Sequence, residues 1–437
     1  MKLPVLAPVV AITLLFAAVA DASQDESGGT IYLGASPTPA PPRKHASTPV
    51  PSSSSVPARN TTPAPKSATQ VPQKASTPAA KPTPAAVVVP RPAATPVLVK
   101  HENVNDIARF IAGLPPEHDA QLTELAKTPE WIAYAASMNN QWPHFDYVKL
   151  AQIRIWSPKE LEKIHISTVF YPFSGPDLIY AVTFFPKASN YILCGLEPVG
   201  DVPSPDKLQP LENSMGWLQA SMKTLFNAGY FVTSDMSVEL KASPMQGTVP
   251  ILCVMLARSG SRITSISTND YMAEIHFVPA SGGDRTLYYF SWDLSNGGLA
   301  KGGAFTAFLR KMHPDTAYVK SASYLMHEDE FSAIRNLLLT QCNTIIQDDS
   351  GIPLRDFDQR RWKLKLYGTY TAPLDIFAKY NQPDMADFYS KNPSTPLTFG
   401  AGYHWKYSDA NLIVATAHAP SAAPAVTPPP AASHTHQ

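Results

Sequence analysis

The chain has 437 residues, no net charge and 44 prolines, many of them between Pro37 and Pro96 together with Ala, Thr, Ser and Lys. A stretch of that composition cannot build a hydrophobic core, so composition excludes a chain that is folded throughout. The neutral total hides a segregation, because no Asp or Glu occurs from Gly28 to Lys100. The N-terminal part is therefore basic and the remainder acidic.

The N-terminus predicts export. An apolar run from Val5 to Val19 closes at Ala20-Asp21-Ala22, which places small residues at the two positions that a signal peptidase recognises. We expect residues 1–22 to be a signal peptide, cleaved before Ser23, and the product to be secreted or periplasmic with no transmembrane span. An uncleaved anchor is the alternative, although the run is shorter than a comfortable bilayer span.

Residues 23–100 are predicted to form a disordered, proline-rich basic tether. Proline has no amide donor and biases its predecessor towards extended backbone, so Ser36 to Pro96 is expected to be a solvated, semi-extended polyproline chain. Its cations favour contact with a cell-envelope polymer or another anionic surface, and reach and solubility alone are the alternative. The tail, residues 417–437, repeats the Pro/Ala composition and is also predicted to be disordered.

Residues 101–416 are predicted to form a single globular α/β domain. Short helices are expected first, since Val104, Ile107 and Ile111 recur at helical spacing. Strand and helix signals then alternate to the end of the domain. This alternation predicts a mixed sheet flanked by helices, with a Rossmann-like βαβ start and later antiparallel hairpins.

The βαβ start is predicted from three segments. Ile164 to Tyr171 is β-branched and aromatic, as is typical of a strand, and a helix is expected to follow with Gly175 as N-cap and Pro176-Asp177 in its first turn. Tyr191 to Cys194 is continuously apolar, which indicates a strand covered on both faces. A hairpin is the alternative, because apolar residues from Leu178 to Phe184 also alternate.

The later elements follow from the same signals. Amphipathic spacing predicts helices over Leu211 to Leu225 and Asp329 to Ile346, and shorter ones over Leu374 to Tyr380 and Met385 to Tyr389. Predicted strands are Tyr230 to Val232, Val249 to Leu256, Ile263 to Ser267, a hairpin of Glu274 to Val278 and Thr286 to Phe290, Trp362 to Tyr367, and a closing hairpin of Leu397 to Tyr403 and Leu412 to Thr416.

The three cysteines each lie in an apolar run and are expected to be free and buried: Cys194, Cys253 and Cys342. No pair of them has metal-ligand spacing, and an odd number excludes a framework of disulfides alone.

The predicted ligand-binding residues surround the first strand-to-helix turn: Ser174, Gly175, Asp177 and Glu197. Backbone amides at such a turn can face an anionic or polar ligand, and an acid after the next strand can hold ribose hydroxyls. In outline, Val169 to Pro198 resembles the first strand, loop and second strand of a Rossmann-type methyltransferase. The loop has one glycine, and Pro176 lacks an amide that a ligand could use, so the resemblance predicts the fold and leaves the cofactor unknown.

The predicted catalytic residues are Asp348, Asp349 and His327. Paired carboxylates can ligate a hard cation or act as general acid and base. The alternative is a polar turn that ends the preceding helix, and no metal site is predicted. A helix over Asp329 to Ile346 would hold the polar group from Lys320 to Glu328 about 27 Å from the aspartates.

The sequence leaves two functions open. The sequence favours a tethered noncatalytic module at the cell envelope that binds a small molecule, a glycan or a protein, because familiar hydrolase signatures are missing. The alternative is an exported hydrolase of an unrecognised family that uses Asp348 and Asp349. Nucleic acid is not an expected partner of an acidic exported domain.

Overall fold

The computed structural model describes residues 98–418 apart from 102–103, 230, 232–244, 246, 302 and 405. These residues all belong to one compact unit. The predicted signal peptide and nearly all of the predicted tether and tail lie outside the described residues, as does most of the strand predicted over Tyr230 to Val232. Two predicted bounds are wrong: Val99 and Lys100, placed in the tether, form a strand with His101, and Ala417, placed in the tail, is the last residue of another strand.

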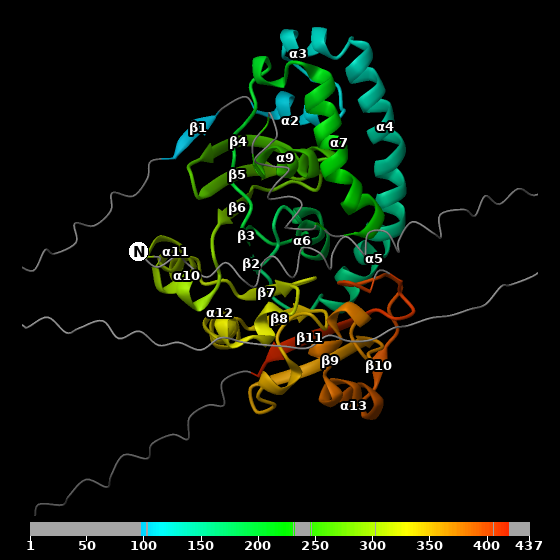
Figure 1. Cartoon of the computed structure of the whole chain (residues 1–437), viewed down its shortest axis with the longest axis vertical. Helices are drawn as coiled ribbons and strands as arrows, with labels where there is room; N and C mark the ends of the chain where they lie inside the picture. Colours follow the sequence, from blue (N-terminus) through cyan, green and yellow to red (C-terminus); the bar gives the residue numbers. More distant parts are fainter. Residues whose placement is uncertain are drawn as a thin grey trace, which may run out of the picture. The chain divides into compact units, whose positions relative to one another are not determined.

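Within the described residues, eleven strands form one mixed sheet in the order β1-β4-β5-β6-β3-β2-β7-β8-β11-β9-β10 (Figure 1). The strands are β1 (Val99–His101), β2 (Thr168–Tyr171), β3 (Asn190–Gly195), β4 (Arg262–Thr268), β5 (Met272–Val278), β6 (Arg285–Ser291), β7 (Thr316–Val319), β8 (Thr344–Gln347), β9 (Trp362–Gly368), β10 (Ser394–Thr395) and β11 (Asn411–Ala417). The predicted α/β fold with a mixed sheet is confirmed.

The centre of the sheet is parallel. Strands β6, β3, β2, β7 and β8 run side by side in the same direction, and antiparallel strands continue the sheet on both sides. Counted in chain order, these five strands have the order 3-2-1-4-5 of doubly wound nucleotide-binding sheets. The order reverses between β2 and β7, which is where ligands bind in such folds, outside the carboxyl ends of the strands.

Helices lie on both faces of the sheet (Figure 1). They are α2 (Asn105–Ile111), α3 (Ala120–Leu125), α4 (Pro129–Phe145), α5 (Ala151–Glu160), α6 (Leu178–Phe184), α7 (Leu211–Ala228), α9 (Val249–Arg258), α10 (Asn296–Lys301), α11 (Gly303–Met312), α12 (Ser332–Gln341) and α13 (Pro383–Lys391). Shorter turns are the π-helix η1 (Asp146–Leu150) and the 3₁₀-helices η2 (Asp206–Leu208), η3 (Leu325–His327), η4 (Asp329–Phe331), η5 (Leu354–Asp356) and η6 (Asp375–Tyr380).

Two large cores form because successive strand residues point to opposite faces. In β3, Tyr191 and Leu193 pack into the core under α2, α4 to α7 and α9, whereas Ile192 and Cys194 pack into the core under α11 and α12. The strand is apolar throughout because both of its faces are covered. The three cysteines are free and buried, as predicted.

The predicted βαβ unit is confirmed, and the hairpin alternative is wrong, since β2 and β3 are parallel and α6 connects them. The predicted start of the helix is two residues too early. Helix α6 begins at Leu178 with Asp177 as its N-cap, and Gly175 has a positive φ of 50°, which lies outside helical geometry.

Two other predicted elements are wrong, and the predicted bounds of a third are wrong. Val249 to Leu256 is helix α9, because a run that is apolar on every side carries no periodicity and Pro250 at its start favours a helix. The helix predicted to reach Ile346 ends at Gln341, where Cys342 turns extended, and β8 follows. Leu397 to Tyr403 forms no strand, and β11 pairs with β8 and β9 instead.

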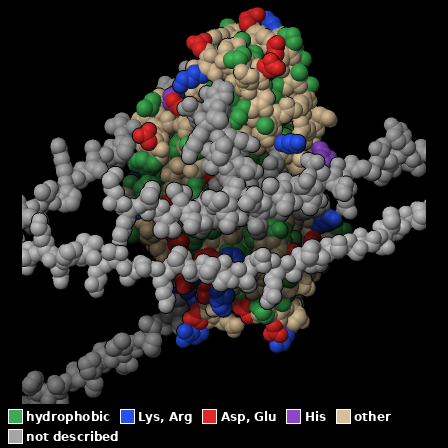
Figure 2. All heavy atoms as spheres, in the orientation of Figure 1, with side chains coloured by type: hydrophobic (Ala, Val, Ile, Leu, Met, Phe, Trp, Pro, Cys, Tyr) green, Lys and Arg blue, Asp and Glu red, His purple; other side chains and the backbone are tan. Residues whose placement is uncertain are grey.

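The surface of the described part mixes charges. Figure 2 shows basic and acidic side chains interspersed at the lower end of the view, where Figure 1 places β9 and α13. Lys391 pairs with Asp387 at 2.7 Å on α13, and Lys365 of β9 pairs with Glu160 at 2.6 Å. No helix in the described residues combines the length and the apolar character that a bilayer crossing requires.

Candidate functional site

The carboxyl ends of the parallel strands gather most of the predicted site residues at one edge of the sheet. Ser174, Gly175 and Asp177 follow β2, Glu197 follows β3, and Asp348 and Asp349 follow β8. Lys320 follows β7, on the other side of the point where the strand order reverses. This is the edge at which doubly wound folds bind ligands.

The loop after β2 is tied to the end of β3. Ser174 donates from its amide to the carbonyl of Cys194 at 2.9 Å, and the amide of Cys194 donates back to Ser174 Oγ at 3.1 Å. The backbone of Gly175 passes so close to the next strand that a Cβ on it would lie 2.8 Å from Glu197 Oε1. The structure therefore brings Ser174, Gly175 and Glu197 together, as the sequence predicts.

Glu197 fills the space beside this loop. Its side chain is fully buried, and Tyr289 donates its hydroxyl to the Glu197 carbonyl at 2.9 Å and approaches Oε2 at 3.4 Å. A Cβ on Gly195 would overlap Oε2 of the same carboxylate. The carboxylate thus packs against two glycines at the place where a ribose-binding acid would face its ligand.

Asp177 does not cap helix α6 with its side chain. Its Oδ2 accepts hydrogen bonds from Lys320 Nζ at 2.7 Å and from the Tyr171 hydroxyl at 2.9 Å. Lys320 also donates to the Gly229 carbonyl at 2.9 Å and lies 4.0 Å above the centre of the Tyr180 ring. Burial raises the pKa of Asp177, while the charge of Lys320 opposes that shift. A buried ion pair therefore joins the ends of β2 and β7.

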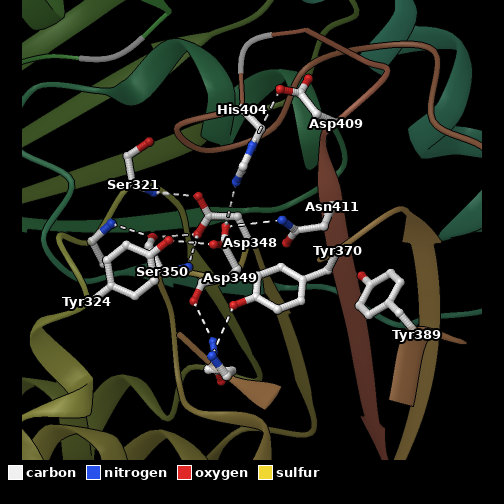
Figure 3. A network of polar contacts seen from close by, with 12 residues as sticks. Ser321, Tyr324, Asp348, Asp349, Ser350, Tyr370, Tyr389, His404, Asp409 and Asn411 are labelled. Atoms are coloured by element: carbon white, nitrogen blue, oxygen red, sulfur yellow. Dashed lines mark hydrogen bonds and ion pairs between the residues drawn. The ribbon is translucent and has the colours of Figure 1, made fainter. Parts of the chain in front are cut away.

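Asp348 and Asp349 lie in a buried polar network (Figure 3). Asp348 Oδ1 accepts from Ser350 Oγ at 2.6 Å and from the Ser350 amide at 3.2 Å, and its Oδ2 accepts from the Ser321 amide at 3.1 Å. Asp349 Oδ2 accepts from the Tyr324 hydroxyl, and its Oδ1 accepts from Asn411 Nδ2 at 3.1 Å. Each aspartate is 1% exposed.

Ser321 and Tyr324 contact the two aspartates directly, contrary to the predicted separation by a long helix. The helix between them, α12, has 10 residues, and strand β8 follows it. Since β7 and β8 are parallel neighbours, their carboxyl ends lie next to each other. The alternative, that Asp348 and Asp349 form a polar turn at the end of a helix, is also wrong, because they follow strand β8.

Two side chains that the sequence did not single out complete the network. His404 Nε2 lies 3.7 Å from Asp349 Oδ1, and its Nδ1 lies 3.7 Å from Asp409 Oδ2. Burial disfavours its charged form, but the contact with Asp349 outweighs burial and raises the pKa of His404. Asn411 begins β11, which pairs with β8. The pairing of β11 with β8 brings Asn411 to Asp349, and the loop before β11 brings His404 there.

His327 lies beside this network. Its ring packs against the rings of Tyr324 and Tyr380, with centroids 5.3 Å and 5.6 Å away. Burial, and then the charge of Arg355, lower the pKa of His327 to about 4, which keeps the ring neutral at physiological pH. The structure therefore connects His327 to Asp349 through Tyr324.

The backbone at this edge is strained. Among the described residues, the non-glycine positions with positive φ are Phe173, Ser321, Ser323 and Tyr324, at 59°, 50°, 52° and 55°, together with His313 at 45°. All but His313 follow the carboxyl end of β2 or β7. Each such residue costs on the order of 1–3 kcal/mol and persists only when its surroundings hold it. The hydrogen bond from the Ser321 amide to Asp348 supplies part of that support.

The raised pKa of Asp348 predicts how the stability of the chain depends on pH. Burial, and then the charge of Asp349, raise it from 3.8 to about 6. A carboxyl group with a raised folded pKa contributes stability below its unfolded pKa, and this contribution is lost as pH rises through the folded value. Between about pH 4 and about pH 7, the parent should therefore lose up to about 3 kcal/mol of its free energy of unfolding through Asp348. Asp348→Asn, which has no carboxyl group to titrate at this position, should not show that loss.

Urea denaturation of both chains at the two pH values measures this difference. A poor fit between the substituted side-chain amide and the Ser321 amide would add the same cost at every pH, so the comparison between the two pH values does not depend on it. An identical pH dependence in parent and variant would show that Asp348 does not titrate in this range.

Comparisons with known proteins give little guidance. No protein-family model matches the chain, and no curated protein matches it. Among solved structures, the chain is similar to a candidate methyltransferase from Porphyromonas gingivalis W83, with 13% sequence identity and a TM-score of 0.28. The match covers 72% of this chain and 57% of that protein, so the chain spans less than two thirds of its length. At this level the likeness carries no argument about activity.

Proposed function

We propose that the chain is an exported, tethered module that binds a ligand or a partner at the cell envelope without catalysing a reaction. The apolar run from Val5 to Val19 supports export, and the basic, proline-rich segment after it supports tethering to an anionic polymer or surface. At about 3.1 Å per residue, roughly 60 polyproline residues could extend on the order of 190 Å. The folded domain then supplies the binding site.

One observation supports binding over catalysis. All four carboxylate oxygens of Asp348 and Asp349 accept hydrogen bonds from the chain itself. A general base or a nucleophile needs a lone pair directed at water or substrate, and both side chains are buried. In the described part of the chain, no group of three or more His, Cys, Asp or Glu side chains is arranged to hold a metal ion. The aspartates therefore fit a structural role.

Thermal unfolding of the purified chain tests the proposal. We expect the midpoint to rise with at least one organic anion, glycan fragment or peptide, because a ligand that binds only the folded state stabilises it. We expect no rise with magnesium or calcium, and no turnover of the stabilising compound. A divalent cation that raises the midpoint of the parent, but not of Asp348→Asn or Asp349→Asn, would contradict the proposal.

A second candidate function is an exported hydrolase that uses Asp348 and Asp349. The raised pKa of Asp348, about 6, favours it, since a carboxyl group that titrates near neutral pH beside a second one is typical of acid–base sites. The strained backbone at Ser321, Ser323 and Tyr324 lies at the same place. Hydrolysis of an ester, glycoside or phosphoester that falls about 100-fold in Asp348→Asn would support this function. Unchanged hydrolysis in that variant would exclude it.

A further inference from the structure

A cavity of about 660 Å³ lies at the amino ends of β3 and β6, at the opposite edge of the sheet from the aspartates. Its walls come from α4, η1, α5, α6, α9, β3 and the β5–β6 hairpin. Small-molecule sites in proteins have volumes of about 300–1,000 Å³. The cavity therefore has the size of a ligand site. None of the catalytic or ligand-binding residues predicted from the sequence lines it.

The apolar walls of the cavity are fixed. Trp142, Tyr191 and Phe277 line it and are buried in the core. Tyr191 donates its hydroxyl to the Phe185 carbonyl at 2.6 Å, and the rings of Tyr191 and Phe277 lie 6.2 Å apart. Because packing already holds these rings in place, a ligand with an apolar body would lose little by ordering them.

The cavity also carries an excess of positive charge. Three arginines and one aspartate line it. Arg154 is neutralised by Asp146, which accepts from Nη1 at 2.7 Å and also from Nη2. In the described residues, Arg258 donates to the Ala112 and Gly113 carbonyls and to Asn139 Oδ1, and Arg285 donates to the Asp284 carbonyl. Neither arginine is bonded to a carboxylate in this part of the chain.

Arg285 also has a buried donor that a ligand could use. Its Nε is buried and has no hydrogen-bond partner in the described structure. A buried N–H without a partner costs about 1–3 kcal/mol, and a turn of the side chain that brings this donor to an anionic acceptor in the cavity would recover that cost. Arg285 lies directly opposite Phe277 across the β5–β6 pair, which places the charge beside an apolar wall.

The helix that forms one wall changes its geometry at the cavity. Helix α4 contains Pro143 and continues into the π-helix η1, which contributes Asp146 and Leu150 to the lining. π-helical turns are rare and occur frequently at functional sites. This wall is a second, independent indication that the cavity is a site.

We propose that this cavity binds a small organic anion with an apolar body, whose charged group lies at Arg285 and Arg258 and whose body lies against Trp142, Tyr191 and Phe277. The proposal names a ligand class for the binding module and rests on the function proposed above. Apolar walls with a few placed polar groups are the usual composition of such sites.

Two fluorescent probes test the charge requirement on the full chain. Anilinonaphthalene sulfonate and phenylnaphthylamine share one aromatic body, and only the first is an anion. We expect one sulfonate to bind per chain, about tenfold more tightly than the neutral probe. Added salt should weaken the binding of the sulfonate and leave the binding of the neutral probe unchanged. Equal affinities, or no effect of salt, would overturn the proposal.

Variants test the residues. Arg285→Gln is expected to weaken the binding of the sulfonate about tenfold, because a charged hydrogen bond is lost. The affinity for the neutral probe should not change. Arg360→Gln is the matched control, because that side chain is 91% exposed and pairs with Asp358, and it should bind both probes as the parent does. Val182→Trp, which fills the cavity, should abolish both.

The outcomes separate the two proposals. If the sulfonate binds Arg285→Gln and Val182→Trp as tightly as the parent, this cavity is not the anion site, and the binding module can still hold its ligand elsewhere. If no organic anion, glycan or peptide shifts the unfolding midpoint, the proposed function itself is wrong. The salt dependence in the parent decides the charge requirement even if a variant does not fold.

Discussion

Lys320→Met is expected to lower the free energy of unfolding by about 3–5 kcal/mol, because it leaves the Asp177 carboxylate buried without its countercharge. The two charged groups are 2.7 Å apart, and their side chains are 6% and 4% exposed. The substitution also removes the donor to the Gly229 carbonyl and the cation above the Tyr180 ring. Methionine has a similar length, so little packing volume is lost.

Urea denaturation of a matched set measures this effect. The double variant Asp177→Asn with Lys320→Met should recover most of the loss, since it removes the unpaired charge. Lys365→Met is the control: Lys365 pairs with Glu160 at 2.6 Å, but its side chain is 53% exposed, so we expect a loss below about 1 kcal/mol. If Lys320→Met costs no more than Lys365→Met, Asp177 is not charged in the folded chain, and the ion pair is not what joins β2 to β7.

Local signals were sufficient for the start of the sheet. The β-branched run that ends at Tyr171, the apolar run from Tyr191 to Cys194 and the helix between them form the predicted parallel unit. Ser174, Gly175 and Glu197 come together because they follow two strands that are neighbours both in the chain and in the sheet. Their proximity needs no knowledge of the rest of the fold.

The ion pair could not be predicted in the same way. Asp177 and Lys320 are 143 positions apart and meet because β7 lies beside β2. That adjacency is a property of the strand order, which no local pattern encodes. The signal that could have found the pair is the position of each residue directly after, or one loop after, an apolar strand, combined with the doubly wound order of parallel sheets.

The helix before the aspartates was predicted too long for a specific reason. Apolar residues from Phe331 to Ile345 keep helical spacing, although Cys342 is extended and Ile345 lies in a strand. The continued pattern arises because α12 and β8 pack into the same core beneath one face of the sheet. Spacing therefore placed Asp348 and Asp349 after a long helix, far from Ser321, whereas Asp348 contacts the Ser321 amide. His404 and Asn411 were missed because their approach to Asp349 depends on the loop before β11 and on its pairing with β8.

Gly402→Ala is expected to lower the free energy of unfolding by about 3–5 kcal/mol, through a steric clash and backbone strain together. Gly402 has a φ of 61°, in the left-handed region, and a Cβ at this position would overlap Asp348 Oδ2. Relief of the overlap requires either the loop or the carboxylate to move. Movement of Asp348 would break the hydrogen bond that its Oδ2 accepts from the Ser321 amide, at a backbone position that is itself strained.

Gly216→Ala is the matched control. Gly216 lies in helix α7, and no neighbouring atom would come within 4 Å of an added Cβ. Because alanine has less conformational freedom in the unfolded chain and a higher helix propensity, we expect a gain of about 0.5–1 kcal/mol. Chemical denaturation measures both effects: the free energy of unfolding should fall in Gly402→Ala and rise in Gly216→Ala.

The stability of Gly402→Ala also bears on function. The loop that carries Gly402 and His404 packs directly on the aspartates, and this contact is part of what keeps them from water. If Gly402→Ala is as stable as the parent, that loop can move away from Asp348 at little cost, and the aspartates become accessible in a state of similar free energy. Such a result would favour the hydrolase over the noncatalytic module, because an accessible carboxylate pair could then meet a substrate.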